Sequence, residues 1–447
     1  MNKIIVTFLF LFLTFTWRQI APKDVRDKVM PWVFACMIAY ITCSTFMPGI
    51  FHALMGLTNY IFFAITCNGF DSGQRNKNDA WGMFMVFWGY MVVSAFWGLD
   101  SINAFFVWMN VCFTTFCCGY YVALWVLKTE GGLRKLLAPI VGVAGITVLA
   151  YYRHGGMIQL DVGMERGIVD LDTLAEGTRV NENGIAVHMI LLLTFLSVAI
   201  LRIRTAGKDK IIKMVAAVIS IPVAILMIRT GSRGGTICLL PIILYFLYSQ
   251  RHRVKKVTQI ATIIMILIAI AFGTRIVMKD ADVLRAFSLN TSSSQSGVYA
   301  SNVDQITTGR FSMWERVVHD MTAGEMLAGQ GLFTYDLTTG RAIIGNAHSM
   351  YMTVFYNSGF IGIILMLSAL VLFIRQGFRL GDRGRLGLLF IGVWLMHGIG
   401  ESWGMTGGGT AILAGFGMGL LSHCQVSNSE FYEMPLAVPG FGAYRWS

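Results

Sequence analysis

The sequence has few charged residues for its length. Only 13% of its 447 residues are Asp, Glu, Lys or Arg, whereas a soluble domain has about a quarter. In contrast, 55% are hydrophobic, and the mean hydropathy is +0.63. The scarcity of charge excludes an ordinary soluble enzyme and is typical of a polytopic membrane protein.

The long polar segments contain no cysteine. All eight cysteines lie in or at the edge of apolar runs, which argues against a disulfide framework or a zinc site. We interpret them as small core residues. The sequence also lacks internal repeats, a P-loop and a GxGxxG fingerprint. It therefore gives no sign of nucleotide hydrolysis, and we expect no cofactor and no metal ion.

Apolar runs of membrane-spanning length fill most of the chain. The first, after Lys3, resembles the core of a signal peptide, but no small-x-small cleavage site follows it, so we predict a retained helix. The region 31–67 contains Pro48, which leaves open a broken or re-entrant piece. We predict an all-α polytopic membrane protein with a bundle of about 12–13 transmembrane helices.

The order of the segments follows from these runs. The predicted divisions are N-terminal transmembrane helices at 1–152, a loop at 153–184, central transmembrane helices at 185–274, a large loop at 275–346, C-terminal transmembrane helices at 347–424 and a tail at 425–447.

The net charge of +11 is concentrated in short connections between apolar runs. This distribution favours contact with a membrane over contact with nucleic acid. The connections at 202–213, 251–256 and 375–385 are strongly basic, and the positive-inside rule places them in the cytoplasm. The loops at 153–184 and 275–346 then lie outside, and the tail lies in the cytoplasm.

The large loop at 275–346 is far longer than a simple connection, and such loops are usually functional or disordered. Its part at 288–297 is polar and of low complexity, so we expect it to be flexible. In the part at 309–333, Phe311, Trp314 and Val318 recur at helical spacing. We therefore expect one or two short amphipathic helices over the outer end of the bundle.

Three separated pieces lie at or lead away from the predicted outer side. They are RTGSRGG at 229–235, GRFSMWERV at 309–317 followed by AGQG at 328–331, and HSMYMTVFYNSGFIG at 348–362. In this order they resemble the O-antigen ligase and polymerase superfamily of bacterial envelope glycosyltransferases. RVNENG at 179–184 resembles the Arg-containing loop of that superfamily. The resemblance covers roughly residues 175–400.

The resemblance implies transfer of a glycan from undecaprenyl diphosphate to an acceptor sugar hydroxyl, at the periplasmic face of the inner membrane and without metal. The implied partners are this lipid-linked donor, the bilayer, and either lipid A–core or a second lipid-linked glycan as acceptor. Ligation to lipid A–core and polymerisation of repeat units both fit. The histidine pattern, with His348, Ser349, Gly359 and Gly362, favours a ligase.

The residues themselves support this chemistry. Displacement at an anomeric carbon needs a base for the incoming hydroxyl and cations for the departing diphosphate. His348 precedes a long apolar run, where the positive end of the helix dipole would keep its imidazole neutral and able to accept a proton. Ser349 or Asn346 could cap this helix, or Ser349 could orient the ring. A histidine that merely bridges water and helix is the alternative.

Arg233, Arg310, Arg179 and Arg229 are the candidate diphosphate ligands, because a guanidinium fits phosphate oxygens with two parallel hydrogen bonds. The glycines around Arg233 predict a turn rather than a continuous helix, and the amides of this turn could also face an anion. Snorkelling of these arginines to lipid headgroups is the alternative explanation.

Two rival classes remain at this point. A lipid-linked oligosaccharide transporter, or flippase, would also have many helices and intramembrane charges, but it predicts cations along a central path and internal repeats. A scaffold protein would use the external loop only to dock partners. The concentration of candidate residues on one predicted side favours the enzyme.

Overall fold

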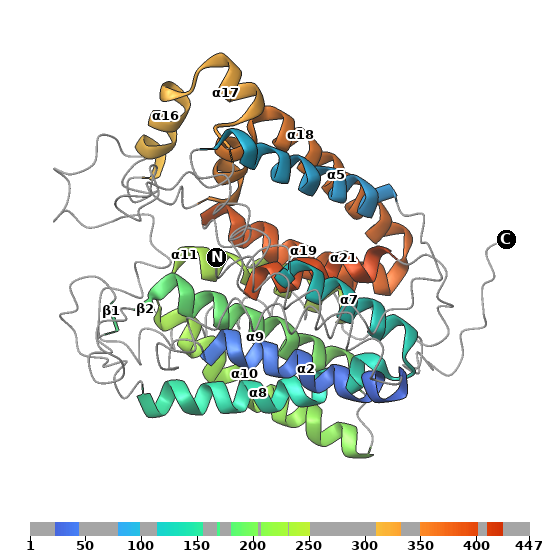
Figure 1. Ribbon diagram of the computed structural model, residues 1–447. Helices are drawn as coiled ribbons and strands as arrows, with labels where there is room; N and C mark the ends of the chain where they lie inside the picture. The colour runs from blue at the N-terminus through green and yellow to red at the C-terminus, as the bar shows by residue number, and fades with distance from the viewer. Residues whose placement is uncertain are drawn as a thin grey trace, which may run out of the picture.

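The computed structural model describes residues 23–43, 79–98, 114–154, 168–169, 180–203, 207–230, 232–250, 310–331, 349–400 and 409–422. These ranges are almost entirely helical, as Figure 1 shows. The exception is a two-residue antiparallel pair of strands, β1 (Ile168–Val169) and β2 (Val180–Asn181), within the predicted outer loop. The predicted all-α polytopic membrane protein is confirmed.

The helices are α2 (Lys23–Cys43), α5 (Asp79–Ser94) with the 3-10 turn η2 (Ala95–Trp97), α7 (Thr114–Lys128), α8 (Gly132–His154), α9 (Glu182–Arg202), α10 (Gly207–Arg229), α11 (Arg233–Ile237), α12 (Leu239–Gln250), α16 (Arg310–Asp320), α17 (Ala323–Ala328), α18 (Met350–Arg379), α19 (Gly381–Gly400) and α21 (Gly409–Ser422).

Within the described ranges, 5 segments are long and apolar enough to cross a membrane: Asp79–Trp97, Gly132–Arg153, Gly184–Arg202, Asp209–Arg229 and Met350–Arg379. Shorter apolar helices are found at Thr115–Lys128, Gly234–Ser249 and Gly409–Ser422. Other predicted apolar runs, including the one after Lys3 and the region around Pro48, lie outside the described residues. The predicted total of 12–13 spans therefore stays a prediction.

Helices α9 and α21 form the centre of the bundle. All of α21 is buried, and Phe416 in it lies against Phe195 of α9 and Phe390 of α19, with ring centroids 5.6 and 4.8 Å apart. A Cβ on Gly415 would overlap the carbonyl of Phe116 in α7, so only glycine permits this approach. Close packing through small residues is typical of helices in a membrane.

The outer helices carry the lipid-facing surface. In Figure 1, α8 and α10 lie on one flank of the bundle, and α5 and α18 on the opposite flank. Large apolar side chains are exposed on both, such as Ile146 and Val218 on the first flank and Ile364 and Val371 on the second. This exposure is expected where the solvent is hydrocarbon.

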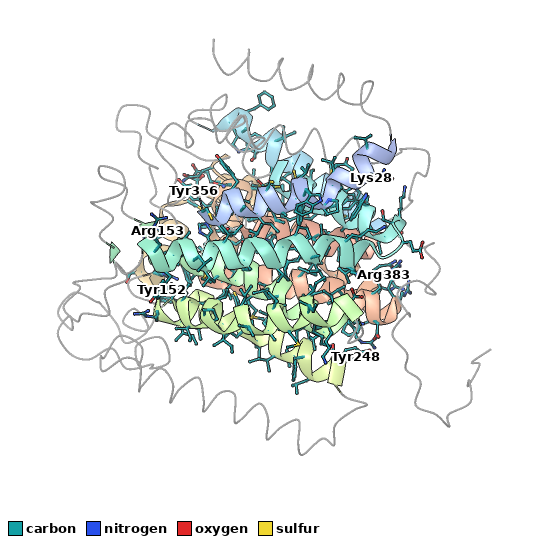
Figure 2. The ribbon with its side chains drawn as sticks, turned by 90° about the horizontal axis from the view of Figure 1, so that it is seen from below. Lys28, Tyr152, Arg153, Tyr248, Tyr356 and Arg383 are labelled. Carbon is teal, nitrogen blue, oxygen red and sulfur yellow. The ribbon has the colours of Figure 1, made fainter. Side chains whose placement is uncertain are left out.

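Two of the predicted cytoplasmic connections meet at one end of the bundle. Arg202, at the end of α9, lies 3.6 Å from Asp382 at the start of α19. Tyr248 of α12 donates a 3.1 Å hydrogen bond to the same carboxylate. Figure 2 shows Tyr248 toward one end, and Tyr152 and Tyr356 toward the other. The basic connection predicted at 251–256, like the tail, lies outside the described residues.

These connections are shorter than the sequence suggested. Helix α18 continues through Arg379 and α19 begins at Gly381, where φ is +60°, so most of the predicted loop at 375–385 is helical. Likewise α10 begins at Gly207, inside the predicted loop at 202–213. The apolar run ends where the charges begin, but Lys and Arg are good helix formers and let the helix continue beyond it.

Candidate functional site

The carboxyl end of α19 is the meeting point of three segments. Arg310, the first residue of α16, donates a hydrogen bond from Nη1 to the carbonyl of Gly400. Ser349 donates from its hydroxyl to the carbonyl of Gly398 at 3.4 Å. Carbonyls in the last turn of a helix have no partner within it, and the negative end of the dipole favours a cation there. Two candidate residues from distant parts of the chain, Arg310 and Ser349, thus bind backbone carbonyls in the last turn of α19.

The third segment is the start of α11. A Cβ built on Gly400 would lie 3.4 Å from the Cα of Gly234 and 3.4 Å from Nη1 of Arg310. The guanidinium of Arg310 and the backbone next to Arg233 therefore flank the same glycine. Arg233 begins α11, and its side chain lies outside the described part of the structure.

The turn predicted around Arg233 is present. Helix α10 ends at Arg229 and α11 begins at Arg233, so the two arginines do not share one continuous helix. Ser232 caps α11 by accepting a 3.2 Å hydrogen bond from the amide of Gly235. This amide, which the sequence suggested for an anion, is used by the cap instead. Partly buried Arg229 lies at the same end of the bundle as Arg233.

Ser349 occupies the N-cap position of α18 but does not cap it with its side chain. Its backbone carbonyl accepts from the amide of Thr353 at 2.9 Å, while its hydroxyl turns to Gly398 of α19. The residue is buried. Ser349 therefore fixes the start of α18 against the end of α19. Whether it orients the histidine ring stays a prediction.

The remaining candidates cannot be placed. His348, Asn346 and Arg179 lie outside the described residues, so their predicted roles stay predictions.

The predicted amphipathic helices of the large loop are α16 and α17. In α16, Phe311 and Val318 are exposed, and Met321, which follows it, packs against Phe355 and Tyr356 of α18. Thr322 and Glu325 form a capping box at the start of α17. Helix α17 and Met321, which precedes it, therefore lie against the first part of α18.

Helix α18 is broken at Gly359, where φ is +61° and ψ is −161°. The segment AGQG (328–331) lies at this break in α18. The amides of Gln330 and Gly331 donate to the carbonyls of Tyr356 and Asn357, at 2.8 and 3.1 Å. A Cβ on Gly359 would overlap the Leu327 carbonyl. The backbone that approaches Gly359 is that of Leu327 and Gly329, so this glycine lets the loop segment come close to α18.

Sequence reasoning missed the acceptors at the end of α19. These acceptors are the backbone carbonyls of Gly398 and Gly400, to which Ser349 and Arg310 donate. No side chain could have indicated them, because every residue carries a backbone carbonyl. His188 of α9 is buried, and its Nδ1 lies 3.2 Å from the hydroxyl of Tyr151.

Comparison with known proteins gives one family match. Residues 215–367 match the family model described as O-Antigen ligase. The match begins within α10 and ends within α18, so it contains Arg229, Arg233 and Arg310 but ends before α19. No curated protein matches the chain. Over residues 215–367, the resemblance of this chain to the O-antigen ligase and polymerase superfamily is confirmed.

Proposed function

We propose that this protein transfers a glycan from undecaprenyl diphosphate to a sugar hydroxyl at the periplasmic face of the bacterial inner membrane. The observation that carries the proposal is the approach of Arg310, Ser349 and the start of α11 to the end of α19. Ser349 is bonded in sequence to His348, and Gly234 to Arg233. A candidate base and two candidate cations thus belong to segments with a common anchor.

The reaction requires one proton transfer and one displacement. The acceptor oxygen attacks the anomeric carbon, and His348 takes the proton that this oxygen loses. The bond from the anomeric carbon to the diphosphate oxygen breaks, and undecaprenyl diphosphate leaves with the electron pair. Arg233 and Arg310, with Arg179 and Arg229, stabilise the negative charge that develops on it. The donor is already activated, so no nucleotide is consumed.

Arg310 suits this role for a geometric reason. A guanidinium carries five N–H donors in a rigid plane, more than the single carbonyl of Gly400 can accept. The bond to Gly400 therefore uses one of these donors and holds the group at the end of α19. A charge held this way also loses little conformational entropy when the diphosphate arrives.

We propose the ligase reaction first, with lipid A–core as acceptor, because the sequence carries the full histidine pattern at 348–362. Polymerisation of O-antigen or exopolysaccharide repeat units uses the same donor and is the alternative. The family match supports an activity of either kind. A flippase is the alternative from another class, but Arg229, Arg310 and Ser349 lie at one end of the bundle, rather than along a path through it.

The test is transfer by the purified protein in lipid nanodiscs. It is given an undecaprenyl-diphosphate-linked glycan and either lipid A–core or a second copy of the donor, and the extended acceptor is identified by mass spectrometry. Extension of lipid A–core supports the ligase, and lengthening of the donor supports the polymerase. His348→Ala should abolish either product, whereas the control His319→Ala, on an exposed position of α16, should retain it. Full transfer by His348→Ala would contradict the proposal.

A further inference from the structure

The AGQG segment (Ala328–Gly331) is held on two sides. One side is α18, through the amides of Gln330 and Gly331 described above. The other side is α5 with η2, which runs along α18 in Figure 1. Four consecutive residues of the large loop are thus enclosed between two helices that belong to distant parts of the chain.

The contacts from α5 and η2 are specific. Tyr90 donates from its hydroxyl to the carbonyl of Ala328 at 3.1 Å. Trp97 donates from Nε1 to the carbonyl of Gly329 at 3.2 Å. The two rings lie near one another, with centroids 6.2 Å apart. Two successive carbonyls of the AGQG segment therefore accept from side chains of one neighbour, while the next two amides donate to the backbone of the other.

This fit depends on glycine. Gly329 and Gly331 have φ of +83° and +100°, where L side chains are rare. A Cβ on Gly329 would overlap the backbone of Asn357, and one on Gly331 would lie 2.6 Å from the Cα of Gly98, just after η2. The segment is therefore in main-chain contact with α18 on one side and with the end of η2 on the other.

The AGQG segment is connected to Arg310 by an ordered stretch of chain. Arg310 begins α16, Met321 packs against α18, and α17 starts with the Thr322 and Glu325 capping box. The stretch from Arg310 to Gly331 thus has two anchors. The first is the bond from Arg310 to Gly400, and the second is the set of contacts made by the AGQG segment. Motion of the AGQG segment would therefore move Arg310.

We infer that Tyr90 and Trp97 are positioning residues for the proposed site. They hold the AGQG segment in the break of α18 and so fix where α16 presents Arg310. Both precede residues 215–367, so the family match does not include them. The effect on catalysis rests on the proposed function, whereas the hold on the segment does not depend on it.

The hold is tested by hydrogen–deuterium exchange of the full-length protein in nanodiscs. The double variant Tyr90→Phe with Trp97→Phe removes both donors and keeps the rings. Loss of the two hydrogen bonds should raise exchange in the peptide covering 323–331 roughly tenfold. The control, Trp32→Phe with Tyr152→Phe, changes two exposed side chains and should leave that exchange unchanged. Exchange equal to wild type in the first double variant would overturn the inference.

The link to Arg310 is tested by a double-mutant cycle on kcat. In the wild-type background, the Tyr90 and Trp97 substitutions should lower kcat roughly three- to tenfold. In the Arg310→Lys background the same substitutions should lower it less than twofold, because the group that they position is already altered. An equal loss in both backgrounds would show that the two residues act through general stability, and would overturn the positioning role.

The two proposals fail in different ways. If wild-type protein transfers no glycan, the proposed function falls, but the exchange result still decides whether Tyr90 and Trp97 hold the segment. If transfer is robust while exchange is unaffected by their loss, the proposed function stands and this inference falls.

Discussion

Arg310 and Gly400 are ninety residues apart in sequence, and a hydrogen bond joins the guanidinium of the first to the carbonyl of the second. The bond ties the large loop to the end of α19. Hydrogen bonds to charged groups contribute about 1.5–3 kcal/mol. This contact links the fold to the proposed chemistry.

Arg310→Ala should lower kcat/KM for glycan transfer roughly 10- to 100-fold, because it removes both the anchor on Gly400 and a cation for the leaving diphosphate. Arg310→Lys should retain an intermediate rate, since it keeps the charge but not the planar fork. Steady-state transfer assays measure both. Arg153→Ala, at an exposed position of α8 at the same end of the bundle, is the matched control. A control loss as large as that of Arg310→Ala would exclude a specific role.

Gly400 separates Arg310 from α11. A methyl group there would meet both neighbours at ordinary contact distance, so Gly400→Ala should retain transfer. The branched side chain of Gly400→Val should push Arg310 from the backbone of Gly234 and lower transfer at least tenfold, by the sensitivity of catalysis to misplacement of about 1 Å. Gly142→Val, on α8 with open space around it, is the control. Equal activities of the two Val variants would contradict this geometry.

The glycines at the break of α18 should be intolerant of any side chain. Gly329→Ala and Gly359→Ala combine positive φ with overlap on a neighbouring backbone, so each should reduce the free energy of unfolding by about 2 kcal/mol or more. Gly324→Ala, in α17 with nothing near it, should be neutral or slightly stabilising. Thermal unfolding in detergent measures all three. A Gly359→Ala protein as stable as wild type would mean that the break is not required.

The capping box of α17 should respond to acid. Thr322 donates from its amide and hydroxyl to the Glu325 carboxylate, at 2.7 and 2.8 Å, and these bonds hold the pKa of that carboxyl below its usual value. A pKa lower in the folded state means that the contribution to stability is complete above the unfolded pKa, about 4.3. It is lost as the pH falls through the folded pKa.

Glu325→Gln should therefore be less stable than wild type at pH 7, and the difference should shrink as the wild-type carboxyl becomes protonated. Melting temperatures of both proteins between pH 3 and pH 7 check this. A difference that grows toward acid would have the wrong sign for a depressed pKa.

The sequence predicted the helices well because lipid imposes long apolar runs that are visible without a structure. It also predicted the turn at Arg233 and the helices after Arg310, since glycine and 3.6-residue periodicity are local signals. It did not predict where α18 and α19 meet. Lys and Arg at the ends of apolar runs mark the membrane boundary, and the helices run past it, as at Arg379.

The parts of the site that sequence reasoning missed share a physical cause. Gly398 and Gly400 contribute backbone carbonyls, and every residue carries a carbonyl, so the side chain gives no signal of the role. Tyr90 and Trp97 contribute common aromatic donors to partners more than two hundred residues away. Only the packing of α5 against α18 brings these pairs together.

The break at Gly359 makes two bonding arrangements compete. In an unbroken helix, the carbonyls of Tyr356 and Asn357 would accept from amides four residues further along. Here the amides of Gln330 and Gly331 donate to them instead. A straight α18 and a docked AGQG segment therefore exclude one another. Any event that straightened this helix would displace the AGQG segment, and the stretch of chain that begins at Arg310 would lose its second anchor.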